Sequence, residues 1–194
     1  MDARIERDQD YKNGVNWGAL AGAAAVGLMA GLAANAGRKA AVQAISTGAA
    51  GDWFEALRNE HRHVEKTFQA ILRTSSNDRM KREMMFKMLK HALQKHAVEE
   101  ENVIYPALRM SAMDGAAKEL FHDHADIKTA LLVLERMPAD APQWLETVRE
   151  LQSKVMEHVR EEEEHIFPAF HQKMDKEENR KLSKLMHLEG VKTA

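Results

Sequence analysis

The feature that most restricts the fold of this chain is a segment that occurs twice, at residues 96–108 and 158–170. Each copy begins with a histidine, has a glutamate four residues later and contains a Pro-Ala pair near its end. The copies align without a gap, 62 residues apart, and single histidines at 61 and 124 precede them. Residues four apart lie on one face of an α-helix. The repeat therefore indicates two helix pairs of the same design that face each other.

Apolar residues recur every three or four positions along four stretches after residue 51, which predicts four amphipathic helices. The first begins at Asp52, an N-cap with Glu55 as its reciprocal acid, and runs to about Arg73. The others are predicted over residues 79–109, 114–137 and 140–171. No strand pattern competes, and long helices joined by short turns are antiparallel neighbours. The predicted fold class is all-α, an up-down antiparallel four-helix bundle.

Six polar residues fall within the apolar stripes of these helices. Their burial without partners would cost several kcal/mol each, roughly, which a small domain does not tolerate. Two divalent cations would remove this cost, because a carboxylate bridges two metals and a neutral imidazole donates one nitrogen to a metal. The candidate metal ligands are His61, His96, Glu100, His124, His158 and Glu162.

Composition narrows the chemistry of this site. The 194-residue chain has no cysteine, which excludes thiolate zinc sites, iron–sulfur clusters, disulfides and cysteine nucleophiles. Imidazole and carboxylate ligation without sulfur suits iron, with zinc and manganese as alternatives. The net charge of −2 provides no basic field for nucleic acid or anionic lipid, and no nucleic-acid partner is expected.

Four motifs in this order resemble the hemerythrin/HHE cation-binding family. They are Glu60-His61-Arg62-His63-Val64, His96-x-x-x-Glu100 with Ile104-Tyr105-Pro106, Asp123-His124-Ala125-Asp126-Ile127, and His158-x-x-x-Glu162 with Ile166-Phe167-Pro168. The resemblance covers about residues 52–172 and implies a non-haem di-iron centre with an oxo or hydroxo bridge. It implies reaction with dioxygen and, as in bacterial members, with peroxide or nitric oxide. It also implies one iron at His61 and His96 and a second at His124 and His158, with bridging carboxylates.

The chain departs from the oxygen carriers of that family at Lys128, where those proteins have a second histidine one turn after the third-helix ligand. This departure favours oxygen or redox sensing, peroxide detoxification or iron handling over reversible oxygen carriage. It does not decide whether the protein is an enzyme. Glu65, one turn after His61, is a possible additional ligand.

Two other classes of function stay open. A ferritin-like di-iron oxidase or iron storage protein uses Glu-x-x-His pairs on two helices. Such pairs occur at Glu60 and His63, Glu119 and His122, and Glu162 and His165. The first two pairs lie off the apolar stripe, which argues against this class. The second class is a non-catalytic, metal-stabilised helical interaction module. An iron-free, spectrally silent protein that stays folded with chelator would favour a structural role of this kind.

The sequence divides into five segments. Residues 1–16 are a polar tail, 17–45 a Gly/Ala-rich helix and 46–51 a linker; residues 52–172 form the hemerythrin-like domain, and 173–194 a C-terminal helix and tail. The C-terminal helix is capped at Asp175 and is expected to end before Gly190.

Small residues dominate the Gly/Ala-rich helix, with glycines four residues apart at 14, 18 and 22 and again at 27 and 31. This spacing lets two helices approach closely and predicts a homo-oligomer through this segment. Residues 17–36 are also near the length of a membrane span, although few of them are strongly apolar. A membrane helix, an oligomerising helix and a signal sequence stay open. The expected location is the cytoplasm, with a tether to the inner membrane through residues 17–36 as an alternative.

Overall fold

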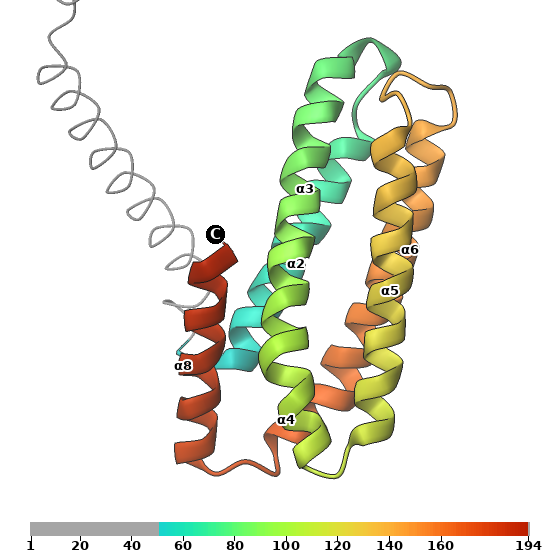
Figure 1. Cartoon of the computed structure of the whole chain (residues 1–194). Coiled ribbons are helices and arrows are strands. Elements are labelled where there is room, and N and C mark those ends of the chain that lie inside the picture. The colour runs from blue at the N-terminus through green and yellow to red at the C-terminus, as the bar shows by residue number, and fades with distance from the viewer. Residues whose placement is uncertain (1–50, 194) are drawn as a thin grey trace, which may run out of the picture. The chain divides into compact units, whose positions relative to one another are not determined.

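The computed structural model describes residues 51–193, and the polar tail, the Gly/Ala-rich helix and almost all of the linker lie outside them. Four helical rods make up the bundle (Figure 1). They are α2 (Trp53–Leu72); α3 (Arg79–Glu99) with η4 (Glu100–Ile104) and α4 (Tyr105–Met110); α5 (Asp114–Arg136); and α6 (Trp144–Glu161) with η5 (Glu162–Ile166) and α7 (Phe167–His171). The structure confirms the predicted all-α bundle. Every helix within residues 51–193 is too short or too polar to cross a membrane.

Local signals define most helix ends. Asp52 caps α2, because its Oδ1 accepts hydrogen bonds from the backbone N–H groups of Phe54 and Glu55, at 2.9 and 3.3 Å. The Glu55 side chain accepts a hydrogen bond from Arg58 rather than closing the predicted capping box. The fourth rod begins at Trp144, later than the predicted residue 140, because a turn precedes it in which Ala141 N–H donates to Pro138 O.

The C-terminal helix α8 (Lys176–Thr193) packs beside α3, η4 and the start of α2. Its predicted cap is present, since Asp175 Oδ1 accepts from the N–H groups of Glu177 and Glu178. The prediction that this helix ends before Gly190 is wrong, because α8 continues through Gly190, which is buried. A glycine costs a helix about 1 kcal/mol relative to alanine, and the packing of α8 on its neighbours outweighs that preference.

The apolar core consists of two clusters, one toward each end of the bundle. One cluster contains Val64, Phe68, Leu89, Leu131, Trp144 and Leu151, among others. The other contains Trp53, Leu57, Leu108, Leu120, Phe167 and Met186, among others. Each fully buried side chain of this size contributes about 1.5–3 kcal/mol. Along α2, His61 lies between Leu57 of one cluster and Val64 of the other, so a polar layer separates the two clusters.

Candidate metal centre

Both copies of the repeated segment leave α-helical geometry at their glutamate. The π-helical segments η4 and η5 begin at Glu100 and Glu162 and are followed by a proline in the next helical turn. Proline has no N–H, so the carbonyl four residues before it loses its α-helical donor. The backbone instead forms a hydrogen bond over five residues, from Tyr105 N–H to Glu100 O, which is typical of a π-bulge.

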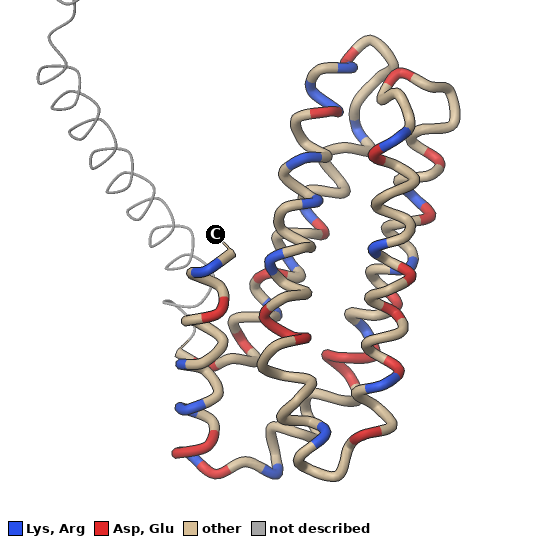
Figure 2. The backbone as a smooth tube through the Cα atoms, in the orientation of Figure 1, with Lys and Arg blue, Asp and Glu red and all other residues tan. Residues whose placement is uncertain are grey.

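The wider turn changes which residues face the core after the glutamate. An uninterrupted α-helical stripe through His96 and Glu100 would continue at Val103 and Ala107, but these two residues are only partly buried. Ile104, Tyr105 and Leu108 are fully buried instead. One extra residue in the turn shifts the buried face by one position and brings the Tyr105 side chain into the polar layer. The acidic residues of η4 and η5 lie at about the same level of the bundle (Figure 2).

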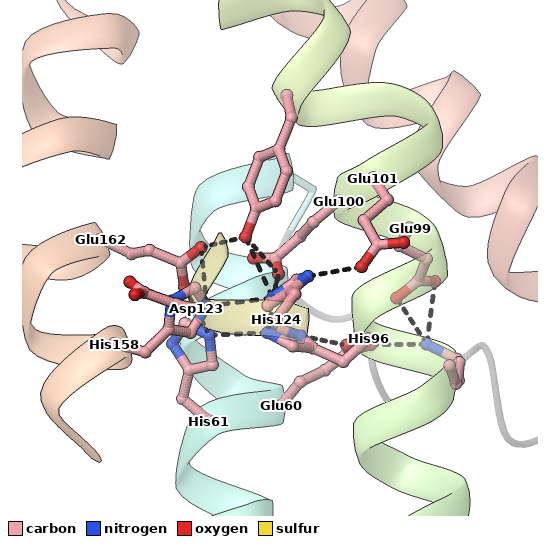
Figure 3. A network of polar contacts seen from close by, with 12 residues as sticks. Glu60, His61, His96, Glu99, Glu100, Glu101, Asp123, His124, His158 and Glu162 are labelled. Carbon is pink, nitrogen blue, oxygen red and sulfur yellow. Dashed lines mark hydrogen bonds and ion pairs between the residues drawn. The ribbon is translucent and has the colours of Figure 1, made fainter. Parts of the chain in front are cut away.

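The structure brings all six predicted ligands together in this polar layer. Each histidine is 4% exposed and each glutamate is fully buried. The six residues form two groups in which one potential ligand atom per residue lies within 4.8 Å of the others. One group holds the first histidine pair, His61 and His96; the other holds the second pair, His124 and His158; and both groups share Glu100 and Glu162. Figure 3 shows these side chains converging.

The histidines point one ring nitrogen at each other and the other at a carboxylate. Nε2 lies 3.0 Å from Nε2 within the first pair and 3.0 Å within the second. The outward Nδ1 atoms contact Glu163 and Glu60 in the first pair, and Glu101 and Asp123 in the second. A carboxylate accepts a hydrogen bond, so Nδ1 carries the proton and Nε2 directs its lone pair inward. Two lone pairs at this distance repel unless a proton or a metal ion lies near them.

The two glutamates lie between the histidine pairs. Glu100 Oε2 is 3.1 Å from His96 Nε2 and 3.3 Å from His124 Nε2, so one oxygen faces both pairs. Glu162 faces His158 through Oε1 at 3.3 Å and His61 through Oε2 at 3.4 Å. Glu100 Oε1 and Glu162 Oε2 are buried without a hydrogen-bond partner. Buried carboxylate oxygens without donors are costly, and their arrangement suits a pair of bridged cations.

Tyr105 places a hydroxyl group at the centre of this arrangement. Its O–H donates to Glu162 Oε1 at 2.8 Å and lies 3.0 Å from His124 Nε2 and 3.3 Å from Glu100 Oε2. Phe167 occupies the corresponding position of the second repeat copy and is buried in an apolar cluster. The first repeat copy therefore contributes a tyrosine hydroxyl to the polar layer, and the second copy contributes no hydroxyl at the equivalent position.

Charges in the layer shift the pKa values of its members strongly. Burial alone would lower the pKa of His96, but the carboxylates of Glu100 and Glu60 outweigh it and raise that pKa well above its usual value. Burial opposes ionisation of Glu162, yet His158 and His61 hold the pKa of Glu162 well below the usual range. Burial and the two glutamate charges raise the pKa of Tyr105 well above 10. The metal-free layer thus retains protons on imidazole and tyrosine that bound metal ions would compete with.

A second buried charge network adjoins His96. Lys95 Nζ donates to Glu60 Oε1 at 2.6 Å and to both carboxylate oxygens of Glu99 at 2.8 Å. Burial would raise the pKa of Glu60, but the hydrogen bond from His96 and the charge of Lys95 lower it to about 2. Burial and the neighbouring charge of Glu60 raise the pKa of Glu99 to about 7. These groups tie His96 to a charged cluster inside the protein.

A cavity of about 20 Å³ lies beside the histidines. Its walls are mainly aliphatic, with Val64, Leu131 and Val155 among them, and the half-exposed Lys128 also lines it. About 10–15 Å³ is enough for one water-sized probe, so this space has room for one molecule of about the size of water. Lys128, in the position that distinguishes the chain from oxygen carriers, binds Glu101, which in turn accepts the Nδ1 hydrogen of His124.

Other predicted ligands lie away from the centre. Glu65 is exposed and accepts a hydrogen bond from Gln69, so its assignment as a possible additional ligand is corrected. It directly follows the buried Val64, which turns it about 100° away from the core-facing side of α2. The histidines of the ferritin-like pairs, His63, His122 and His165, are exposed, so the ferritin-type ligand set is not assembled.

Tyr105 and the roles of the four outer carboxylates were missed at the level of sequence. The carboxylates are Glu60, Glu101, Asp123 and Glu163. A signal was nevertheless present, because an acid precedes both single histidines and another follows both repeat glutamates. Acids next to a core stripe point toward the edges of the helix interface, where they reach the outward nitrogens of neighbouring histidines.

A four-helix bundle with a buried histidine and glutamate layer defines a class of helical metal-binding protein. Residues 53–170 match the family model described as "Hemerythrin HHE cation binding domain", and the chain belongs to this family. The protein is therefore a metal-binding, hemerythrin-like protein.

Two curated proteins are similar in sequence to this chain. The chain is 31% identical over 124 residues to a protein named "DNA nickase" from Nostoc sp., and this match covers 64% of the chain and 35% of that protein. It is 27% identical over 129 residues to an uncharacterised hemerythrin-like protein from Schizosaccharomyces pombe, with 64% of the chain and 62% of the relative covered. The chain spans less than two thirds of either relative. No solved structure matches the chain.

Proposed function

We propose that the polar layer holds two iron ions, one at each histidine pair, with Glu100 and Glu162 bridging both ions. The observation that supports this most directly is the convergence of four inward imidazole nitrogens on two fully buried carboxylates. Two carboxylate oxygens there have no hydrogen-bond partner. Two divalent ions would satisfy these atoms and offset the repulsion between the imidazole lone pairs.

The proposed ligand of the centre is dioxygen, peroxide or nitric oxide. Iron supplies Lewis acidity and one-electron redox chemistry when bound. The protein contributes a small, mainly aliphatic cavity next to the histidines, which limits the size of a ligand. Tyr105 contributes a hydroxyl group whose oxygen lies 2.8 Å from Glu162 Oε1 and which donates its proton to that carboxylate. Lys128 contributes a positive charge at the cavity wall.

We infer a role in oxygen or redox sensing, peroxide detoxification or iron handling, rather than reversible oxygen carriage. Family membership and the lysine at the position of the carrier histidine support this choice. The nicking activity named for the Nostoc relative is not part of the proposal, because the similarity covers 35% of that protein. We further propose that the chain is cytoplasmic and assembles through its Gly/Ala-rich segment.

The proposal predicts two equivalents of iron per chain after anaerobic loading and gel filtration. Exposure of this ferrous protein to oxygen should produce near-ultraviolet charge-transfer bands. His96→Ala and Glu162→Ala should each lower the iron content and abolish the bands. His165→Ala is the matched control, since this histidine on η5 is 62% exposed, and it should behave as the parent protein. Full iron occupancy in both core variants, or iron-free parent protein after loading, would refute the assignment.

A further inference from the structure

The two histidine pairs are related by the internal repeat, but their surroundings are not equivalent. Positions 60, 95 and 99 around the first pair correspond to positions 123, 157 and 161 around the second. The first set is Glu, Lys and Glu, and the second is Asp, Glu and Glu. The sequence thus departs from its own repeat at two of these three positions, Glu60 against Asp123 and Lys95 against Glu157.

The His96 ring is held by the carboxylate of Glu60, and that carboxylate is held in turn by Lys95. Its Nδ1 lies 3.1 Å from Glu60 Oε2, and the other oxygen of Glu60 binds Lys95, as described above. The side chains of Glu60, Lys95 and Glu99 are 11%, 7% and 0% exposed. Little water is present to compete with these contacts, so the orientation of the His96 ring is set before any ion binds.

His158 has a weaker support. Its Nδ1 lies 3.4 Å from Asp123 Oδ2, near the limit for a hydrogen bond, and the Asp123 side chain is 44% exposed. The aspartate is one methylene shorter than the glutamate at the equivalent position. The residues that correspond to Lys95 and Glu99 are Glu157 and Glu161, and both are exposed. Water competes for Asp123, and the His158 ring is less firmly held.

His61 and His124 do not compensate for this difference. Each donates from Nδ1 to a glutamate at 2.8 Å, Glu163 for His61 and Glu101 for His124. The exposed fractions of these two glutamates are 22% and 21%. The asymmetry therefore resides in the supports of His96 and His158.

We propose that the two metal positions are unequal, with the ion at His61 and His96 bound more tightly and the ion at His124 and His158 exchanging more readily. This inference rests on the proposed di-metal centre. Glu60, Lys95 and Glu99 are positioning residues for the first ion, because they act through His96. Asp123 is the corresponding, weaker positioning residue for the second ion.

The test is a titration of the metal-free full-length protein with Co²⁺ in competition with a chromophoric chelator. We expect two binding steps that differ at least about tenfold, since outer partners of metal-bound histidines change affinity roughly 10- to 100-fold. Glu60→Gln should weaken the tighter step, and Asp123→Ala should weaken the looser step alone. Asp123→Glu lengthens the weaker support and should bring the two steps closer together.

Glu157→Ala is the matched control for Asp123→Ala. It removes an exposed negative charge next to His158 in sequence without removing the contact to Nδ1. Equal weakening by both variants would assign the effect to general charge and overturn the inference. Loss of the tighter step in Asp123→Ala would overturn it as well.

The results also separate this inference from the function on which it rests. Two equivalents of Co²⁺ bound with equal affinity would overturn the inequality and leave the di-metal centre standing. Binding of fewer than two equivalents of Co²⁺ at saturation would overturn both the inequality and the di-metal centre. Circular dichroism of each metal-free variant identifies any variant that has not folded. In that case the Co²⁺ titration of Asp123→Glu tests the inequality, because a substitution at this half-exposed position perturbs folding least.

Discussion

Replacing Tyr105 by phenylalanine tests whether the polar layer depends on a proton donor when no metal is bound. The ring is fully buried and packs edge-on against Phe121, with a centroid separation of 5.0 Å, and phenylalanine retains this packing. The substitution removes the O–H that donates to Glu162 Oε1 at 2.8 Å. It also removes the longer contacts of the hydroxyl with His124 Nε2 and Glu100 Oε2, but the hydrogen bond to the Glu162 carboxylate is the shortest of the three.

The expected magnitude follows from the charge of the acceptor. A hydrogen bond to a charged group contributes about 1.5–3 kcal/mol, so the free energy of unfolding of the metal-free protein should fall by about 2 kcal/mol. Bound metal ions would satisfy the Glu162 oxygens by coordination. The cost of Tyr105→Phe in the metal-loaded protein should then fall to about 1 kcal/mol or less, the range of a neutral hydrogen bond.

The assay is urea unfolding followed by far-ultraviolet circular dichroism, with chelator and, separately, with saturating Zn²⁺ as a redox-silent ion. The midpoint should change and the denaturant slope should not, because the same surface is exposed on unfolding. A change under about 0.5 kcal/mol without metal, the size of an ordinary surface substitution, would refute the role given to the hydroxyl. An equal loss with and without metal would show that the ions do not reach Glu162.

Three further predictions address acidity, the cavity and a corrected ligand. The pKa of His96 is raised on folding, so its contribution to metal-free stability is complete below about pH 6.5 and is lost as pH rises through the folded value. The pKa of Glu162 is lowered on folding, so its contribution to stability is lost as pH falls below about 4.5. Thermal unfolding with chelator should show both losses of stability. A melting temperature that stays constant from about pH 6 to 9 would contradict the prediction for His96. Val155→Ile adds a methylene beside a cavity of about 20 Å³. Overpacking costs of about 1–3 kcal/mol imply that azide binding to the iron-loaded protein should weaken by about 5- to 150-fold. Azide titration followed by absorbance measures this, and unchanged affinity would place the ligand elsewhere. Glu65→Gln should leave the iron content unchanged and alter stability by less than about 0.5 kcal/mol, whereas loss of an ion in metal analysis would restore Glu65 as a ligand.

The sequence was most informative where α-helical periodicity applies. His61 and His124 lie in uninterrupted stripes of α2 and α5, and both are buried as those stripes predict. His96 and Glu100 share a face for the same reason, because the helix is regular up to the glutamate. Helix ends with a side-chain cap, such as Asp52, were also predicted from local residues.

Beyond Glu100 the same reasoning placed the buried face one residue away from where it lies, because one periodicity was assumed for the whole rod. Pro106 was visible in the sequence, yet a proline inside a helical stripe predicts a kink or an end and does not specify a π-bulge. Uninterrupted α-helical geometry would place Tyr105 beside the stripe, although its side chain is fully buried. The contact of Lys95 with Glu60 was also beyond sequence reasoning, since it joins two helices whose relative rotation only the folded chain defines.

The polar layer also explains why this bundle is built as two apolar clusters rather than one. Replacing buried charged groups by well-packed apolar residues of similar volume often stabilises a protein by about 1–4 kcal/mol. A bundle selected for stability alone would continue the apolar stripe through positions such as His61 and Glu162. The chain instead places polar side chains midway between the clusters and surrounds His96 with a further buried lysine and two glutamates. The general preference for apolar cores is broken where all four rods meet, and a metal ion bound there would link the rods and supply both stability and chemistry.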